Sequence, residues 1–209
     1  MARNLVPKCK QCRRAGEKLF LKGERCNTAK CAIIKKNYPP GFHGPKGGKR
    51  KSDYGMQLNE KQKAKRQYQL LEKQFRLTFD RASKKPGNSG DNFILMLETR
   101  LDNTIYRLGF AESRTKARQI VNHGHITING KKVTIPSYQV RPGEVIGIKE
   151  KSKNSKLFKD FAEKAKNIKA PGWLNLEVKE LTGKILHNPS IKDVNTNINA
   201  QMIVEFYSK

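Results

Sequence analysis

Residues 97–133 read LETRLDNTIYRLGFAESRTKARQIVNHGHITINGKKV, and this stretch decides the fold. Apolar residues recur every three or four positions from Phe93 to Leu108, a period that predicts one helix. Gly109 follows in the position where helices commonly end. Ser113 can then cap a second, shorter helix, because its hydroxyl can accept a hydrogen bond from the first helical turn. The stretch therefore begins with two helices.

Short strands follow these helices. Asn129-Gly130 joins the runs 126–128 and 131–133, and an Asn-Gly pair between such runs is the strongest short-range signal for a β-hairpin. Residues 145–148 predict a further strand. Two helices and short strands, in one module of about 60 residues, indicate the α+β class.

Two further helices are expected on either side of this module. Asn59 can N-cap a helix over 59–82, with Gln62 three residues later as its capping-box partner. A lysine-rich amphipathic pattern predicts another helix over 150–169. Residues 37–58 are rich in Gly, Pro and basic side chains, which suits either a flexible linker or an arm that folds against RNA. The aromatic residues in this segment favour the arm.

Changes in composition along the chain predict five parts. The expected architecture is α+β, with a small N-terminal metal knuckle, a helical domain and an inserted RNA-binding module of two helices plus short strands. In order, the parts are a cysteine metal-binding module (1–36), a basic extended arm (37–58), a helical domain (59–96), the RNA-binding module (97–155) and a C-terminal segment expected to pack on the helical domain (156–209).

The charge balance indicates a polyanionic partner. The chain has 44 Lys and Arg against 18 Asp and Glu, a formal net charge of +26 and a pI near 10.1. Self-repulsion of this size opposes compaction unless a polyanion or counterions neutralise it, and such a pI is typical of nucleic-acid binders. No run approaches the roughly 20 apolar residues that span a bilayer, and the N-terminus lacks the apolar core of a signal peptide. We therefore expect a cytoplasmic nucleic-acid binder with no membrane partner.

All four cysteines lie close together in the sequence. Cys9 and Cys12 form a C-x2-C pair, Cys26 and Cys31 form a C-x4-C pair, and thirteen residues lie between the two pairs. In a reducing cytosol such a cluster is more often a metal site than two disulfides. Four thiolates suit one tetrahedral zinc ion and leave no position for a substrate, so the ion would be structural. An iron–sulfur cluster takes the same ligands and stays open as an alternative.

Basic side chains are expected on helix faces away from the apolar stripe. Arg100 and Arg107 are about two turns apart, and Arg114 and Arg118 about one, so a row of guanidinium groups can bind phosphates bidentately. The two histidines that flank Gly124 either cap a helix or donate to RNA. The candidate RNA-binding residues are Arg3, Lys8, Arg13, Arg14, Lys22, Lys30, Lys46, Lys49, Arg50, Lys51, Lys61, Lys63, Lys65, Arg66, Arg100, Arg107, Arg114, Lys116, Arg118, His123, His125, Lys131 and Lys132.

The central stretch resembles a known RNA-binding domain. The motifs LETRLDN (97–103), YRLGF (106–110), HGHI (123–126) and NGKKV (129–133) are similar to the S-four domain. That domain also occurs in pseudouridine synthases, tyrosyl-tRNA synthetases and heat-shock RNA-binding proteins. By itself, this resemblance implies RNA binding and little more.

The flanking sequence narrows the resemblance. The motifs SDYG (52–55), EKQK (60–63), EKQFR (72–76) and IVEFYSK (203–209) are similar to bacterial small-subunit ribosomal protein S-four. The cysteine module resembles the metal-bearing branch of that family. The resemblance runs essentially from end to end of the chain.

This family resemblance implies a structural role in the small ribosomal subunit. It implies early binding to the 5′ domain of the small-subunit rRNA, nucleation of subunit assembly and an influence on decoding accuracy. It also implies contact with the neighbouring ribosomal protein S-five and a place near the channel through which mRNA enters. No homo-oligomer is expected.

The rival is an RNA-modifying enzyme, such as a pseudouridine synthase, that uses the S-four domain as a binding arm. Room for a catalytic domain exists only in the tail 155–209, whose acidic residues show no paired arrangement for acid–base chemistry. His43 and His187 lack a recognisable nucleophile partner. A zinc-finger transcription factor would need a recognition helix and a dimer scheme, and the sequence shows neither. We therefore expect no enzymatic activity.

Overall fold

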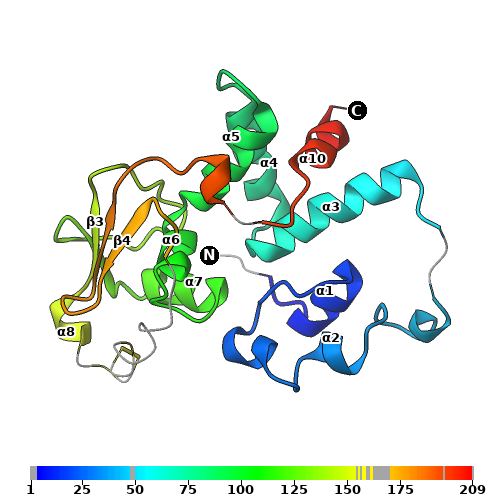
Figure 1. The fold of residues 1–209 in the computed structure, drawn as a ribbon, viewed down its shortest axis with the longest axis horizontal. Helices are drawn as coiled ribbons and strands as arrows, with labels where there is room; N and C mark the ends of the chain where they lie inside the picture. The colour runs from blue at the N-terminus through cyan, green and yellow to red at the C-terminus, as the bar shows by residue number, and fades with distance from the viewer. Residues whose placement is uncertain are drawn as a thin grey trace. The chain divides into compact units, whose positions relative to one another are not determined.

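A computed structural model gives the arrangement of most of the chain. The backbone divides into two compact units, one of residues 1–94 and 196–209 and the other of residues 95–195. The first unit consists largely of helices and short turns, and the second combines a small sheet with short helices (Figure 1). Among the described residues, no helix has the length and apolar character that crossing a membrane requires. The structure describes residues 4–47, 50–153, 155, 157–158, 161, 170–194 and 196–208.

Short helical segments build the N-terminal part of the first unit. They are α1 (Lys8–Ala15), the 3-10 turn η1 (Gly23–Asn27), α2 (Ala32–Lys35) and the 3-10 turn η2 (Gly44–Lys46). Gly16 ends α1 with a φ of 81°, the left-handed conformation that is common after a helix. Cys12, Leu19 and Leu21 form a small buried core. So small a core provides little hydrophobic stabilisation of its own.

The next helix, α3 (Asp53–Gln67), begins earlier than expected. Ser52 is its N-cap, since the Ser52 side chain accepts a hydrogen bond from the Gly55 amide at 3.3 Å. The prediction that Asn59 caps the helix is wrong. Asn59 lies inside α3, where its side-chain amide donates to the Gly55 carbonyl at 2.6 Å. The Ser52 cap and the acidic first residue, Asp53, both suit a helix start and outweigh the later signal.

α4 (Glu72–Ser83) is a separate helix, so the predicted continuous helix over 59–82 is wrong. The chain turns at Gln69, which has a positive φ of 55°. Tyr68 and Leu70, on either side of Gln69, are both buried. Residues two apart lie on nearly opposite faces of a helix, so the break allows both side chains to leave solvent.

Aromatic side chains join the remaining helices of the first unit. These helices are α5 (Ser89–Glu98), which continues into the second unit, and α10 (Ala200–Tyr207). Phe75 and Phe79 of α4 meet Phe93 of α5 at ring-centroid distances of 4.9 and 5.6 Å. Phe79 also meets Tyr207 of α10 at 4.6 Å, and α10 packs on α3. The end of the chain therefore helps to form the core of the first unit.

The predicted single helix through residues 93–108 is also wrong. α5 ends at Glu98, and α6 (Leu101–Arg107) begins as a new helix. The carbonyl of Thr99, between them, accepts a hydrogen bond from the Val140 amide at 2.9 Å. A carbonyl inside a continuous helix would instead accept from the amide four residues later, so this long-range contact replaces helical pairing.

Local signals correctly predicted the next elements. Ser113 caps α7 (Arg114–Asn122) by accepting from the Lys116 amide at 3.3 Å. Asn129 and Gly130 have φ values of 49° and 78°, the left-handed conformations of a tight hairpin turn. The sheet is antiparallel, in the order β2-β1-β3-β5-β4, and consists of β1 (Ile126–Ile128), β2 (Lys131–Lys132), β3 (Val145–Ile148), β4 (Leu174–Glu177) and β5 (Thr182–Ile185).

Helix α6 packs closely on this sheet. Leu101, Ile105 and Leu108 are fully buried in one core with Trp173. A Cβ atom on Gly183 of β5 would lie 2.5 Å from a methyl carbon of Leu108, so only glycine fits there without displacement. The Leu108 side chain, at the end of α6, therefore packs directly on the backbone of β5.

The helix predicted over 150–169 is interrupted. α8 (Glu150–Lys153) is followed by turns, in which the amides of Ser155, Phe158 and Phe161 each donate to the carbonyl three residues earlier. Three residues per turn bring Phe158 and Phe161 to the same side, and both are buried. The rest of this predicted helix falls largely outside the described residues.

The C-terminal segment 156–209 is divided between the two units. Residues 170–194 contribute β4, β5 and the 3-10 turn η3 (Ile191–Asp193) to the second unit. Helix α10 belongs to the first unit, with Asn199 as its N-cap. The sheet of the second unit thus includes strands from this late part of the chain.

Candidate RNA-binding surface and cysteine cluster

Two buried carboxylates organise the arginines of the second unit. Glu98, which is 1% exposed, accepts two hydrogen bonds from the Arg107 guanidinium at 2.9 and 2.8 Å. The side-chain amide of Asn103 donates to Glu98 at 2.9 Å, and its oxygen accepts from Arg114 Nε at 2.8 Å. Paired bonds between a guanidinium and a carboxylate fix both orientation and distance. Glu98 therefore connects α5 with α6 and, through Asn103, with α7.

Asp102 forms a second centre. Its two oxygens accept hydrogen bonds from Nε and a terminal nitrogen of Arg100, each at 3.1 Å. One of these oxygens also accepts from Arg118 at 2.9 and 2.5 Å. Asp102 is 3% exposed and Arg100 is 5% exposed. Removing one member of such a group leaves a buried charge uncompensated, so the members stabilise the fold only together.

The prediction that the arginines lie on exposed helix faces is wrong for Arg100 and Arg114. Both are buried, because Glu98 and Asp102 point into the interior and need cationic partners there. The other two arginines of the row are partly exposed. Binding of RNA by these four residues stays a prediction.

Sequence reasoning missed the partners of these arginines. Glu98, Asp102 and Asn103 are not among the candidate residues, although all three are buried and hydrogen-bonded. Tyr106 belongs to the same group, since the Arg114 guanidinium lies 4.6 Å from the centre of its ring. No helical spacing signal pointed to these pairs, because Asp102 and Glu98 have arginine partners two, nine and sixteen residues away in the sequence.

Exposed cations lie on and beside the β1–β2 hairpin. Lys131 and Lys132 form the edge strand β2, and both are exposed. The Lys132 side chain lies against Gly124, where an added Cβ would collide with it. His123 is exposed, with its ring centroid 6.1 Å from that of His125. These residues form one basic surface that can bind phosphates.

His125 has a structural contact within this surface. Its Nδ1 atom lies 2.9 Å from the Ser152 hydroxyl, so the residue just before β1 is connected with α8. Burial, followed by the charges of His123 and Lys149, lowers the pKa of His125 below its ordinary value of 6.5. The contact with Ser152 favours the structural interpretation for His125, whereas the exposure of His123 leaves its ring accessible to RNA.

Ion pairs within the protein engage the lysines of α3. Lys61 and Lys65 each lie 2.6 Å from Glu72, and Lys63 lies 2.7 Å from Glu60. Burial alone would raise the pKa of Glu72, but hydrogen bonds from Lys61 and Lys65 lower it to about 2. Lys61 is only 5% exposed, so its ammonium group belongs to the interior of the first unit.

Three more candidates are partly buried in the first unit. Lys8 donates to the Asn4 carbonyl at 3.1 Å, and Arg13 donates to the Tyr38 carbonyl at 2.9 Å. Burial lowers the pKa of Arg66. Lys8 and Arg13, which were predicted to bind RNA, therefore bind backbone carbonyls of the protein itself.

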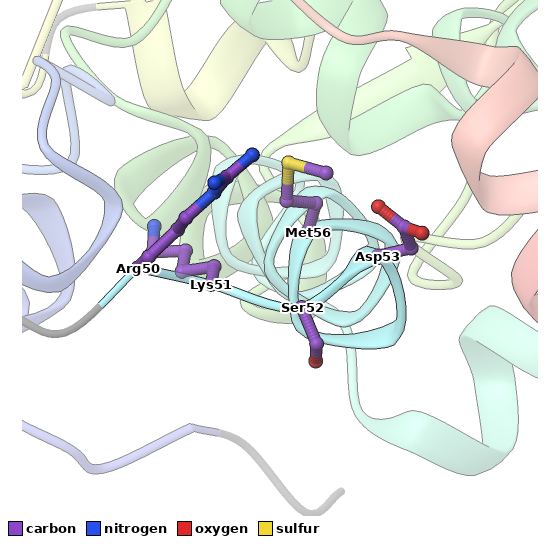
Figure 2. Close-up of a pocket in the computed structure, with 5 residues that line it drawn as sticks. All are labelled: Arg50, Lys51, Ser52, Asp53 and Met56. Atoms are coloured by element: carbon purple, nitrogen blue, oxygen red, sulfur yellow. The ribbon is translucent and has the colours of Figure 1, made fainter.

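The remaining candidates are mostly exposed. Arg50 and Lys51 line a shallow depression with Ser52, Asp53 and Met56, at the start of α3 (Figure 2). In Figure 2, Arg50 and Asp53 lie on opposite sides of Met56. Four further candidates are exposed: Arg14, Lys22, Lys30 and Lys46. Lys116 pairs with Glu112 at 3.1 Å. Arg3 and Lys49 lie outside the described residues.

The four cysteines line one small cavity. Cys9, Cys12, Cys26 and Cys31 are all free thiols, and the last three are buried. Burial raises the pKa of Cys12, against a hydrogen bond from the Leu19 backbone that lowers it, and the other three thiols raise it further. Within the described part of the chain, no three Cys, His, Asp or Glu side chains are placed to hold a metal ion as they stand. Metal binding stays a prediction.

Comparison with known proteins settles the family. The family model described as the ribosomal protein S4/S9 N-terminal domain matches residues 3–98, and the S4 domain model matches residues 99–146. The sequence is 51% identical to small ribosomal subunit protein uS4 of Thermus thermophilus over 209 residues, which is all of both chains. The chain belongs to the uS4 family. With the same full coverage, the uS4 proteins of Halothermothrix orenii and Thiobacillus denitrificans are 52% and 53% identical to it.

The two matched domains adjoin in the sequence between α5 and α6. The boundary at residues 98 and 99 coincides with the end of α5, just before α6. The S4 domain of this uS4 chain thus begins within the arginine–carboxylate network and continues through α6, α7 and β1. Strands β4 and β5 lie beyond the matched region and complete the same sheet. The predicted family and the α+β fold, a helical N-terminal region followed by an S4 domain, are confirmed.

Proposed function

We propose that this uS4-family chain is a structural constituent of the small ribosomal subunit, that it binds rRNA and that it performs no catalysis. The observation that carries the proposal is the match over the full length of relatives named as small ribosomal subunit proteins. The rival, a pseudouridine synthase with an S4 binding arm, has less support, because relatives that match residues in both the N-terminal and S4 domains are named as small ribosomal subunit proteins. Its place of action is the cytoplasmic ribosome.

Attraction between exposed cations and phosphates supplies most of the affinity in this proposal. The net charge is +26, and exposed cations lie in both units, on Arg50 and Lys51 and on Lys131 and Lys132. Contacts to phosphates position a protein on RNA without reading its sequence. Selectivity therefore comes from the shape of folded RNA at a helix junction.

A binding comparison tests this mode. Affinity is measured for an rRNA fragment of the 5′ domain and for an equally long RNA duplex, across a series of salt concentrations. We expect tighter binding to the fragment and a steep linear fall of log affinity with log salt concentration. Equal affinity for both RNAs would contradict recognition of shape, and a shallow slope would contradict the electrostatic mode.

The finer role follows the family resemblance. We propose that the chain binds the 5′ domain early and nucleates assembly of the subunit. In reconstitution of subunits from purified parts, we expect omission of the chain from the first step to reduce the yield more than omission from the last step. A yield that does not depend on the time of addition would contradict nucleation.

Two neighbours are proposed on the same ground. They are ribosomal protein S-five and mRNA near the channel through which it enters, and these contacts would account for an influence on decoding accuracy. Crosslinking of assembled subunits tests both contacts, with crosslinks to S-five and to mRNA as the expected products. Crosslinks to other proteins alone would contradict the proposal.

We also propose that the four cysteines bind one structural zinc ion, which would place the chain in the metal-bearing branch of the family. Four thiolates are a common ligand set of structural zinc. Lys8, Lys22 and Arg25 line the same cavity, and their positive charges would offset part of the negative charge that four thiolates bring to one ion. The bound ion would cross-link segments whose apolar core has only three buried side chains. The proposal requires the thiol groups to turn toward a common centre on binding.

Metal analysis of protein purified without oxygen tests the cysteine proposal. We expect one zinc per chain, lost together with the fold of the N-terminal module when Cys12 is replaced by serine. If the analysis finds iron and inorganic sulfide instead, the cysteines bind an iron–sulfur cluster and not zinc. Metal-free protein with four titratable thiols and an unchanged fold would contradict metal binding.

A further inference from the structure

A compact loop follows the cysteine module, and α1 holds its first residues in place. The Arg13 guanidinium donates to the Tyr38 carbonyl at 2.9 Å and to the Pro39 carbonyl at 3.1 Å. The same guanidinium lies 4.6 Å from the centre of the Tyr38 ring. Two hydrogen bonds and a cation–π contact from one side chain restrict where the loop begins.

The loop then folds back on its own start. Gly44 packs against the Pro39 carbonyl so closely that an added Cβ would clash with it, and it would also lie 3.2 Å from the Tyr38 ring. The Gly44 amide donates to the Gly41 carbonyl at 3.1 Å, which closes the turn. Only glycine fits at position 44 without moving the backbone. Phe42 and His43, between Gly41 and Gly44, therefore form the tip of the loop, and the contacts of Gly44 fix its position.

Phe42 occupies this tip and points into solvent. Its exposed fraction is 88%, the highest among the large hydrophobic residues of the described chain. The edge of its ring meets the His43 ring at a centroid distance of 5.3 Å and an interplanar angle of 86°. A Phe side chain at an ordered turn contributes nothing to the core from this position, so its ring is available to a partner.

The charge around the loop favours a nucleic acid as that partner. Residues 4–47 contain eleven Lys and Arg and two Glu. The same basic character continues beyond this range in Arg50 and Lys51, which are both exposed. A polyanion drawn to this surface brings unpaired bases within reach of Phe42, and an aromatic face is a standard stacking platform for such bases.

We propose that Phe42 stacks on an unpaired base of the rRNA, with Gly44 and Arg13 as the residues that hold its loop in position. The proposal rests on the proposed rRNA binding and adds a base contact to a surface that otherwise contacts phosphates. Because stacking needs a planar face rather than apolar area alone, substitutions can separate a base from an apolar pocket on a neighbouring protein.

Affinity measurements on the full chain form the first test, with the 5′-domain rRNA fragment as the probe. We expect Phe42→Ala and Phe42→Leu to weaken binding roughly 5- to 150-fold, the range for loss of one stacked base. Phe42→Tyr and Phe42→Trp should retain affinity. Leu5→Ala is the matched control, since Leu5 is an 84% exposed apolar residue of the same unit, and its affinity should not change. Thermal unfolding checks that each variant is folded.

Fluorescence of the Phe42→Trp variant forms the second test. The natural chain has one tryptophan, Trp173, which is fully buried and provides a constant reference signal. Stacking on a base should quench the new exposed indole when the rRNA fragment is added. A Leu5→Trp variant should show much weaker quenching. Equal quenching in both variants would overturn the proposal, because it would report the proximity of RNA and no stacking.

The outcomes separate this proposal from the function on which it rests. A natural chain that does not prefer the rRNA fragment overturns the rRNA-binding proposal and the stacking proposal together. A natural chain that binds, with a Phe42→Ala variant of equal affinity, overturns stacking alone. Retained affinity in Phe42→Leu would indicate simple apolar contact and would overturn stacking. Normal rRNA affinity of Phe42→Ala with failed incorporation into subunits would indicate a protein partner, and this also overturns it.

Discussion

The Lys61 ammonium group lies 2.6 Å from the Glu72 carboxylate, across the break that separates α3 from α4. It also lies 4.6 Å from the centre of the Phe206 ring, and the Tyr207 hydroxyl donates to Glu72 at 3.1 Å. Burial and then the charge of Glu72 raise the pKa of Tyr207. One lysine and one glutamate thus connect three helices from distant parts of the sequence.

Replacing Glu72 by glutamine should destabilise the first unit. The change leaves Lys61, which is 5% exposed, without its anionic partner. The Glu72 side chain is itself 44% exposed, and solvent screening reduces the loss, so we expect about 1–2 kcal/mol in the free energy of unfolding. Urea unfolding measures this value, with Glu180→Gln, at an exposed position, as the control expected to change little. Equal losses in both variants would contradict a special role for the pair.

The same pair predicts a dependence of stability on pH. The folded protein holds the pKa of Glu72 at about 2, below its ordinary value of 4.5, so ionised Glu72 favours the folded state. This contribution is complete above about pH 4.5 and disappears as the pH falls toward 2. The difference in unfolding free energy between the natural chain and Glu72→Gln should therefore shrink between pH 5 and pH 2.5. A difference that is constant over this range would contradict the low pKa.

Replacing Asp102 by asparagine should lower the free energy of unfolding more than the loss of any exposed ion pair would. Arg100, buried beside Asp102, would keep its charge and lose its counter-ion. We expect a loss of about 3–5 kcal/mol in the free energy of unfolding, the range for breaking a buried pair. Glu150→Gln is the control, because its pair with Lys153 is exposed and should contribute less than about 1 kcal/mol. Similar losses for the two variants would show that the Asp102 network does not stabilise the fold.

A methyl group at Gly183 should disturb the contact between α6 and the sheet. In Gly183→Ala the new Cβ would lie 2.5 Å from Leu108, which must then move within a packed core. Overpacking of this kind costs about 1–3 kcal/mol. Gly55→Ala is the matched control, since its Cβ would meet Ser52 Oγ at an acceptable 3.4 Å and would sit within a helix. Calorimetry should show a lower melting temperature for the Gly183 variant only.

Neutralising Lys131 should weaken rRNA binding without affecting stability. Lys131 is exposed on the edge strand β2. In Lys131→Gln, loss of one phosphate contact should reduce the slope of log affinity against log salt concentration by about 1. Lys153→Gln is a control from the same unit, because that lysine already pairs with Glu150. An unchanged slope in Lys131→Gln would exclude Lys131 from the phosphate contacts.

Elements set by neighbouring residues were predictable from the sequence, and those set by distant contacts were not. The Ser113 cap and the Asn129-Gly130 turn depend only on residues a few positions away in the sequence, so α7 and the hairpin were predicted correctly. The break at Gln69 depends instead on burial of the side chains beside it. Strand β5 was not predicted either, because pairing with β3 and β4 defines it. Its sequence, Thr-Gly-Lys-Ile, has no strand pattern of its own.

The candidate site divides in the same way. Exposed lysines such as Lys131 could be chosen from charge and turn position alone. The interior position of Arg100 could not, because it follows from Asp102, an acid that the fold turns inward. The spacing of the cysteines indicated a cluster, and all four thiols line one cavity. Amino-acid type thus identified the chemistry, while tertiary contacts decided which groups face solvent.

The packing of α10 on α3 has a consequence for how the protein is made. α3 ends at Gln67 and α10 begins at Ala200, so the ribosome completes one long before it starts the other. At roughly 5–20 residues per second, the delay is on the order of ten seconds. During this time Lys61 lacks the aromatic rings of α10 that later cover it. A transcript truncated before Ala200 would yield a basic chain in which the face of α3 that packs on α10 stays uncovered. Proteases cleave such incompletely packed chains more readily than the folded protein.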